Sequence, residues 1–254
     1  MGKGLLAVIP ARGGSKRIPD KNVLPFFGHP MLAYAIAAAR NSGLFERIVV
    51  STESAEIGKM AIWYGAEYLA RPPELASDTA DLVDVSLHVL QTLAAEGFQP
   101  QALCQLMPNC PLRRGEDICN HFREFQDSKR KFQISVVPYR AVYPHWAVAQ
   151  EEDGGRFIFG TDHLANSQTL TKAYCPTGAI WWAQTEAFIE QRAFYGNPYY
   201  LACMDANRGI DIDDAADLAL ADLLVRGLRD RDGTSPLEDV TAKPFQAGAV
   251  DRLR

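Results

Sequence analysis

A short cationic loop between residues 9 and 22 is the part of this chain whose residue types point most clearly to chemistry. It reads IPARGGSKRIPDKN and directly follows the apolar run at 5–9. Its charged side chains are four cations and one acid: Arg12, Lys16, Arg17, Lys21 and Asp20. Because Gly13 and Gly14 have no Cβ, backbone N–H groups around them can approach phosphate oxygens closely. The loop therefore predicts a site for an anion.

The spacing of the glycines helps to decide which of three known kinds of phosphate-binding loop this segment matches. A Walker A loop needs a glycine directly before the lysine, whereas a serine precedes Lys16. A dinucleotide fingerprint needs a third glycine leading into a helix, whereas Pro19 and Pro25 keep this loop extended. A nucleotidyltransferase loop around the triphosphate of an NTP fits better, with Arg12 and Lys21 neutralising the departing pyrophosphate. A solvated turn is the remaining alternative.

A second motif, IDID at 210–213, contains two acids that are two positions apart. In an extended strand such positions point to the same face, so Asp211 and Asp213 would form a Mg²⁺ site, and NTP chemistry needs Mg²⁺. The alternative is a charged strand end, or a helix start where Asp213 and Asp214 face the positive end of the helix dipole. No histidine lies in a motif typical of a general base, so we expect the metal to activate the attacking hydroxyl.

Alternating strands and helices must position these motifs. Apolar runs predict strands at 5–10, 47–52, 66–70, 102–107, 133–139 and 178–183. Helical periodicity predicts helices at 30–43, 54–66, 81–95, 116–127 and 185–192, and a long final helix after 213. This order predicts an α/β fold: a Rossmann-like, mainly parallel sheet with helices on both faces. Ligands of such sheets lie beyond the carboxyl ends of the strands, where the cationic loop begins.

Two segments depart from this rhythm. Residues 139–177 are rich in aromatic side chains and predict an arm inserted for dimerisation, because exposed aromatic residues suit a subunit interface. From 229 to 254 the chain is polar, and we expect an irregular tail after a nucleotidyltransferase domain at 1–228.

Composition excludes several other classes of protein. The 254 residues carry a net charge of −5, which argues against a nucleic-acid partner, although residues 1–40 are basic. No apolar run reaches the roughly 18 residues of a membrane span. Five cysteines without a C-x-x-C pair indicate free thiols in a reducing compartment, so we expect a cytoplasmic protein.

Six segments together resemble the bacterial acylneuraminate cytidylyltransferases, also called CMP-sialic acid synthetases. They are IPARGGSKRIPDKN (9–22), RIVVSTESAEI (47–57), RPPELASDTA (71–80), MPNCPLRRGEDI (107–118), PTGAIWWA (176–183) and GIDIDDAADL (209–218). They occur in the family's order over about residues 5–224. The resemblance implies a homodimer that transfers CMP from CTP to the anomeric hydroxyl of a nine-carbon sugar acid.

The resemblance also implies roles for individual residues. Arg12, Lys21, Asp211 and Asp213 would be catalytic, and the two aspartates would bind Mg²⁺. The CTP-binding residues would be Ala11, Arg12, Gly13, Gly14, Ser15, Lys16, Lys21, Asn22, Arg71 and Ala80, with Arg71 and Ala80 at the cytosine. The sugar-binding residues would be Met107, Asn109, Ser167, Gln168 and Thr177. The arm would form the dimer and help close the sugar site of the partner subunit.

The departures from the family pattern lie on the sugar side. Where sialate enzymes typically read Q-P-T-S-P-L-R, this chain reads MPNCPLR at 107–113, and a serine at 167 replaces an arginine. The segment SKRIPDKN (15–22) resembles the same segment in the family branches that activate pseudaminic or legionaminic acid. Two other functions stay open: a nucleotidyltransferase for another NTP or sugar, and a non-catalytic nucleotide-binding paralogue.

Overall fold

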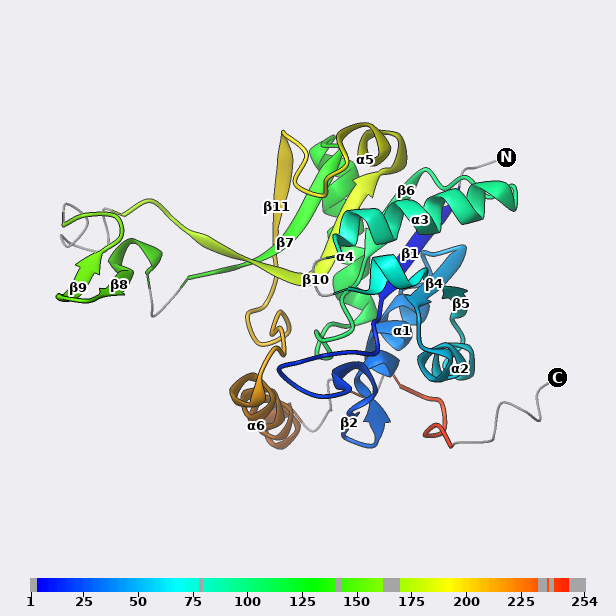
Figure 1. Cartoon of the computed structure of the whole chain (residues 1–254), viewed down its shortest axis with the longest axis horizontal. Helices are drawn as coiled ribbons and strands as arrows, with labels where there is room; N and C mark the ends of the chain where they lie inside the picture. The colour runs from blue at the N-terminus through cyan, green and yellow to red at the C-terminus, as the bar shows by residue number, and fades with distance from the viewer. Residues whose placement is uncertain are drawn as a thin grey trace.

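A seven-stranded sheet, in the order β11-β7-β10-β6-β1-β4-β5, forms the centre of the computed structural model (Figure 1). The structure describes residues 4–77, 80–139, 143–161, 170–232, 237 and 240–246. The strands are β1 (Leu5–Pro10), β4 (Arg47–Thr52), β5 (Glu67–Ala70), β6 (Ala102–Gln105), β7 (Phe132–Pro138), β10 (Tyr174–Gln184) and β11 (Tyr199–Cys203). Within this sheet β10 runs antiparallel to its neighbours, β6 and β7, and the other pairs are parallel. The expected mainly parallel sheet is confirmed.

Helices cover both faces of the sheet. They are α1 (Met31–Ser42), α2 (Ala55–Trp63), α3 (Leu82–Ala95), α4 (Gly115–Ser128), α5 (Thr185–Gln191) and α6 (Ala215–Asp232). Side chains alternate along β1, so that Leu5, Ala7 and Ile9 pack with α1, α2 and α4. Leu6 and Val8 face the opposite core, formed with α3 and α5. This period of two is what a strand buried on both faces requires.

A third apolar cluster is formed by residues of the cationic loop, α1 and α6. Figure 1 shows α6 below the carboxyl ends of the strands. It includes Ile18 of the cationic loop, Ile212 between the two aspartates, and Ala221 and Val225 of α6. Short elements complete this region: η1 (Lys21–Val23), β2 (Pro25–Phe26) and β3 (His29–Pro30). Apolar packing therefore holds the two sequence motifs against each other.

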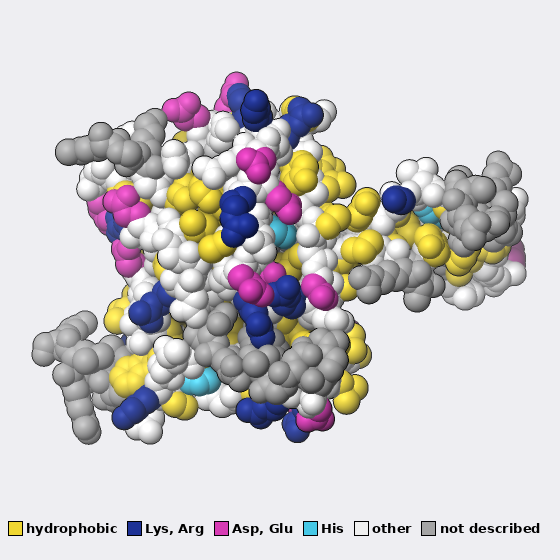
Figure 2. All heavy atoms as spheres, turned by 180° about the vertical axis from the view of Figure 1, so that it is seen from behind, with side chains coloured by type: hydrophobic (Ala, Val, Ile, Leu, Met, Phe, Trp, Pro, Cys, Tyr) yellow, Lys and Arg dark blue, Asp and Glu magenta, His cyan; other side chains and the backbone are white. Residues whose placement is uncertain are grey.

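The segment between β7 and β10 projects from the body as an arm (Figure 1). Its stem continues the β7–β10 pairing to Pro138 and Tyr174, and its tip is the hairpin of β8 (Val148–Glu151) and β9 (Gly154–Phe157), preceded by η3 (Pro144–Trp146). Apolar side chains gather along the arm in Figure 2, and the large exposed ones are Trp146, Val148, Ile158 and Phe159. These side chains form an apolar surface that the body of the same chain does not cover.

Parts of the C-terminal segment pack against the body of the protein. Helix α6 continues to Asp232, and Leu237 is buried in the third apolar cluster. Trp63 Nε1 donates a hydrogen bond to Lys243 O at 2.8 Å, and the Trp63 and Phe245 rings meet edge to face. The expectation of an irregular segment from 229 onward is therefore wrong for 229–232, which continue α6. Leu237 and residues 240–246 lie outside helices and strands, but some of them pack against residues that lie far away in sequence.

The sequence pattern also missed the edge strand β11. Tyr199, Tyr200 and Leu201 of this strand are all partly exposed, so it shows no alternation of buried and polar residues. Its pairing with β7 is what defines it as a strand. In the described ranges, none of the helices combines the length and the apolar character that crossing a bilayer requires.

Candidate active site

A cavity of about 490 Å³ opens where β1, β5 and β6 end. Its walls are Pro10, Arg12, Ser15, Lys16, Arg17, Lys21, Asn22, Arg71, Leu75, Ser77, Ala80, Leu82, Val85, Met107, Pro108, Asn109 and Asp213. Ten of these are residues for which the sequence suggested a role: Arg12, Ser15, Lys16, Lys21, Asn22, Arg71, Ala80, Met107, Asn109 and Asp213. The cavity thus joins the cationic loop to Asp213, one of the two acids of the second motif.

The remaining candidate residues lie elsewhere. Ala11 is buried and does not line the cavity, and its N–H donates to Ser51 O at 3.0 Å. Gly13, Gly14, Asp211 and Thr177 do not line the cavity. Ser167 and Gln168 fall outside the described residues.

The start of the cationic loop is held by two polar contacts. Asn22 Nδ2 donates to Arg12 O at 2.8 Å, and Gly13 N donates to Glu53 Oε1 at 2.6 Å. The N–H of Gly13 therefore already has a protein acceptor, contrary to its expected approach to a phosphate. Glu53, at the end of β4, was not singled out in the sequence, because a single polar residue after a strand carries no distinctive signal.

Arg71 is a buried cation in the wall of the cavity. Its guanidinium donates to Ser51 Oγ at 3.2 Å, to Ser51 O at 2.5 Å and to Leu75 O at 3.4 Å. Burial lowers the pKa of Arg71, Glu53 opposes this change, and Arg12 adds to it. These contacts fix the side chain, so Arg71 can present a donor to a ligand without first being ordered.

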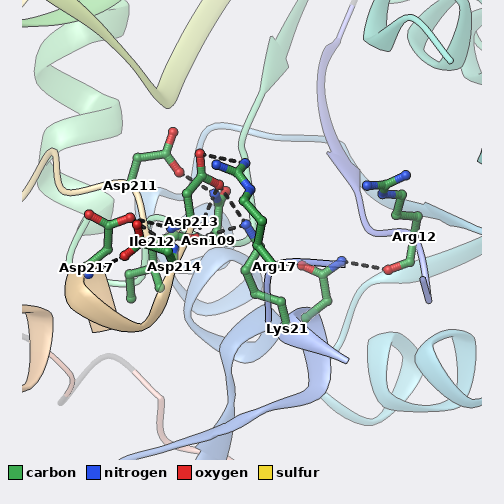
Figure 3. A network of polar contacts seen from close by, with 10 residues as sticks. Arg12, Arg17, Lys21, Asn109, Asp211, Ile212, Asp213, Asp214 and Asp217 are labelled. Atoms are coloured by element: carbon green, nitrogen blue, oxygen red, sulfur yellow. Dashed lines mark hydrogen bonds and ion pairs between the residues drawn. The ribbon is translucent and has the colours of Figure 1, made fainter. Parts of the chain in front are cut away.

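Asp213 faces the cationic loop (Figure 3). Lys21 Nζ lies 2.9 Å from Asp213 Oδ1 and also donates to Ile212 O at 2.9 Å, and Arg17 forms an ion pair with Asp213 Oδ2 at 2.9 Å. Burial tends to raise the pKa of Asp213, but the hydrogen bond and charge of Lys21, together with Arg17, outweigh it and lower the pKa. Asp213 therefore stays ionised. Arg12 lies apart from this cluster (Figure 3).

Asp211 has the opposite electrostatic environment. Burial and the neighbouring charge of Asp213 raise its pKa to about 6, although Lys21 and a backbone hydrogen bond from Gly178 oppose the change. The carboxamide of Asn109 joins the two acids, since Nδ2 donates to Asp211 Oδ1 and lies 3.3 Å from Asp213 Oδ1.

The two aspartates come together without the strand that their spacing suggested. Residues 210–213 belong to no sheet, and Ile212 N donates to Asn109 O at 2.9 Å. Asp214 then caps α6: its Oδ1 accepts from Ala216 N and Asp217 N, while Asp217 Oδ2 accepts from Asp213 N and Asp214 N. This reciprocal capping fixes the backbone just after the acidic pair.

Comparison with known proteins agrees with this geometry. A family model described as cytidylyltransferase matches residues 6–147. The chain is 31% identical over 224 residues to the pseudaminic acid cytidylyltransferase of Campylobacter jejuni, covering 87% of this chain and 96% of that protein. This chain belongs to the cytidylyltransferase family.

A second relative is named for another sugar acid, and a solved synthetase shares the fold. This chain is 33% identical over 218 residues to the N-acylneuraminate cytidylyltransferase of Escherichia coli, covering 85% of this chain and 51% of that protein. A solved CMP:2-keto-3-deoxy-manno-octonic acid synthetase in complex with CTP has the same fold, with a TM-score of 0.64, 16% identity, and coverage of 88% of this chain and 99% of that one.

On the predicted sugar side, Met107 and Asn109 line the cavity and Thr177 does not. Thr177 is buried in β10, where its Oγ1 lies 2.9 Å from Ser135 Oγ and accepts from Ala179 N at 3.3 Å. The backbone of β10 nevertheless reaches the cavity wall, because Met107 N donates to Gly178 O at 3.1 Å. In this structure, Thr177 orders a strand and does not face the cavity.

Asp211 and Asp213 of this cytidylyltransferase are two carboxylates that both contact the carboxamide of Asn109. No group of three or more histidine, cysteine, aspartate or glutamate side chains in the described part of the chain is arranged to hold a metal. Two carboxylates that contact one amide group do supply the oxygen ligands that Mg²⁺ prefers. Burial and the charge of Asp213 raise the pKa of Asp211, and a cation bound between the two carboxylates would oppose both effects.

Proposed function

We propose that this cytidylyltransferase transfers CMP from CTP to the anomeric hydroxyl of a nonulosonic, sialic-acid-like sugar acid and releases pyrophosphate. The observation that carries the proposal is the contact of Lys21 Nζ with Asp213 Oδ1 at 2.9 Å, across 192 positions of sequence. This contact joins Asp213, which lines the cavity, to the cationic loop, and so supports a site that contains both motifs. The names of the relatives support CTP and a nine-carbon sugar acid as the substrates.

The cationic residues of the cavity would bind the triphosphate. Arg12, Lys16 and Lys21 line it, and preorganised cations stabilise the charge that develops on a departing pyrophosphate. Arg71 and the backbone at Ala80 would contact the cytosine. The apolar side chains of Leu82 and Val85 lie in the same wall and would exclude water from the nucleotide.

Asp211 and Asp213 would hold Mg²⁺, which when bound would polarise the α-phosphate and lower the pKa of the sugar hydroxyl. Lys21 holds Asp213 in place from one side, and Asn109 holds both acids from the other. Attack by the anomeric oxygen would proceed in line with the departing pyrophosphate. The protein supplies position and charge, and no histidine of the described ranges lines this cavity.

The sugar acid is proposed to belong to the pseudaminic or legionaminic group. A pyrophosphate-release assay with CTP and pseudaminic, legionaminic or N-acetylneuraminic acid tests this, and a sweep over the four NTPs tests the nucleotide. We expect release with CTP and one of the first two acids. Pyrophosphate release with another NTP but not with CTP would contradict the proposal. Failure of every tested sugar acid to support release with CTP would also contradict it.

The same proposal includes a cytoplasmic homodimer formed through the arm. The exposed Trp146, Val148, Ile158 and Phe159 support the interface, and the five free cysteines suit a reducing compartment. The double variant Ile158→Ser, Phe159→Ser should shift the mass measured by light scattering from dimer to monomer. Leu223→Ser, which changes an exposed leucine of α6, is the control. A wild-type monomer at micromolar concentration would contradict the dimer.

A further inference from the structure

The carboxamide of Asn109 has an unusual set of neighbours. Its Nδ2 faces three acceptors, namely Asp211 Oδ1, Ile212 O at 3.2 Å and Asp213 Oδ1 at 3.3 Å. An amide NH₂ group has two hydrogens, so these three oxygens outnumber its donors. The positive end of the amide dipole therefore stands between two carboxylates, which is where a cation would lie (Figure 3).

The other end of the same amide has no partner among the residues that the structure describes. Asn109 is 4% exposed and lines the cavity, and its Oδ1 is buried without a hydrogen bond from this part of the chain. A buried carbonyl oxygen in this state is unfavourable, because it has lost water and gained nothing in return. The present orientation satisfies the acids at the expense of the amide oxygen.

We propose that Asn109 is a third oxygen ligand of the cation held by Asp211 and Asp213. Half a turn about the Cβ–Cγ bond exchanges the positions of Nδ2 and Oδ1, which have nearly the same size. The oxygen then stands beside both carboxylates, and the donor group leaves the place of the cation. This inference rests on the proposed cation site and assigns Asn109 to it, in place of the sugar-binding role suggested by the sequence.

The backbone around Asn109 favours this role. Asn109 O accepts from Ile212 N at 2.9 Å, so the residue is fixed to the segment that carries both acids. Arg113 Nη1 donates to Met107 O at 3.3 Å and to Ala179 O at 2.5 Å, which holds the turn that contains Asn109 against β10. Rotation of the amide breaks none of these backbone contacts.

Titration of Mn²⁺ alone, followed by the electron paramagnetic resonance signal of the free ion, tests the inference. Asn109→Leu has neither a donor nor an oxygen ligand and should bind Mn²⁺ about 10- to 100-fold more weakly than wild type. Asn109→Asp keeps the shape and the oxygen ligand, so it should bind Mn²⁺ at least as tightly as wild type. Asn120→Leu, on the exposed side of α4, is the matched control and should bind like wild type.

Thermal melting gives a second readout that does not depend on activity. In EDTA, Asn109→Asp should melt below wild type, because a third carboxylate then stands beside Asp211 and Asp213 and the amide donor is lost. Mn²⁺ should raise the melting temperature of this variant more than that of wild type. Equal Mn²⁺ affinity in Asn109→Leu and wild type, or weaker binding by Asn109→Asp, would overturn the role of Asn109 alone. Absence of Mn²⁺ binding by wild type would overturn the cation site itself.

Discussion

Replacing Asp211 by asparagine should make the metal-free protein more stable while it abolishes most of the activity. The carboxylate is buried next to Asp213, and these two causes raise its pKa from the ordinary 3.8 to about 6. The folded state therefore binds this proton more tightly than the unfolded chain does. Below pH 3.8 both the folded and the unfolded chain hold this proton, so the group does not lower the free energy of unfolding. As the pH rises to about 6, the unfolded chain loses the proton first and the free energy of unfolding falls. The full loss of stability is therefore present at neutral pH.

The size of the effect follows from the two pKa values. A rise from 3.8 to about 6 corresponds to about 3 kcal/mol, since each tenfold change in the dissociation constant is about 1.4 kcal/mol. The new amide of the variant Asp211→Asn keeps an oxygen that can accept from Asn109 Nδ2, so little is lost in exchange. We expect a gain of about 1–3 kcal/mol at about pH 8, or roughly 2–10 °C in melting temperature for a chain of this size.

The assay is thermal or urea unfolding in EDTA at about pH 8 and about pH 5, with pyrophosphate release measured in parallel. The stability gain should shrink at the lower pH, where Asp211 of the wild type is largely protonated, and turnover should fall by about 10²-fold or more. Asp127→Asn, an exposed position on α4, is the control. An Asp211→Asn variant no more stable than wild type at the higher pH would refute the electrostatic reasoning.

Three further predictions concern the supports of the cavity. Lys21→Met should lower kcat/KM for CTP by about 10²–10³-fold without changing the circular dichroism spectrum, because a preorganised cation is lost; a loss below twofold would contradict the phosphate role. Glu53→Ala should raise KM for CTP more than it lowers kcat, because Gly13 N loses its acceptor, whereas Glu53→Gln should behave nearly like wild type; equal defects in both variants would point to the charge instead. Leu237→Ala should lower the free energy of unfolding by about 2–3 kcal/mol, since it opens a space in the third apolar cluster; denaturant unfolding with no loss of stability would show that the tail does not support the fold.

The local signals in the sequence were strong wherever the chain obeys short-range rules. The apolar run before the cationic loop became β1, Ser54 caps α2 by accepting from Ile57 N, and Gly43 ends α1 with a positive φ of 65°. Each of these outcomes depends on neighbours within a few positions. The mainly parallel sheet followed from their order, because such a succession of strands and helices has few alternative ways to bury its apolar faces.

The contacts that build the site depend on residues far apart in the chain, and only the tertiary structure decided them. The spacing of Asp211 and Asp213 suggested that they act together, but their actual approach depends on Asn109 and on the packing of Ile212. Glu53 next to Gly13 carried no sequence signal. β11 and the tail also take their form from distant partners. Residue types limit the chemistry that a chain can perform, whereas the position of each donor and acceptor is set by long-range packing that no short pattern contains.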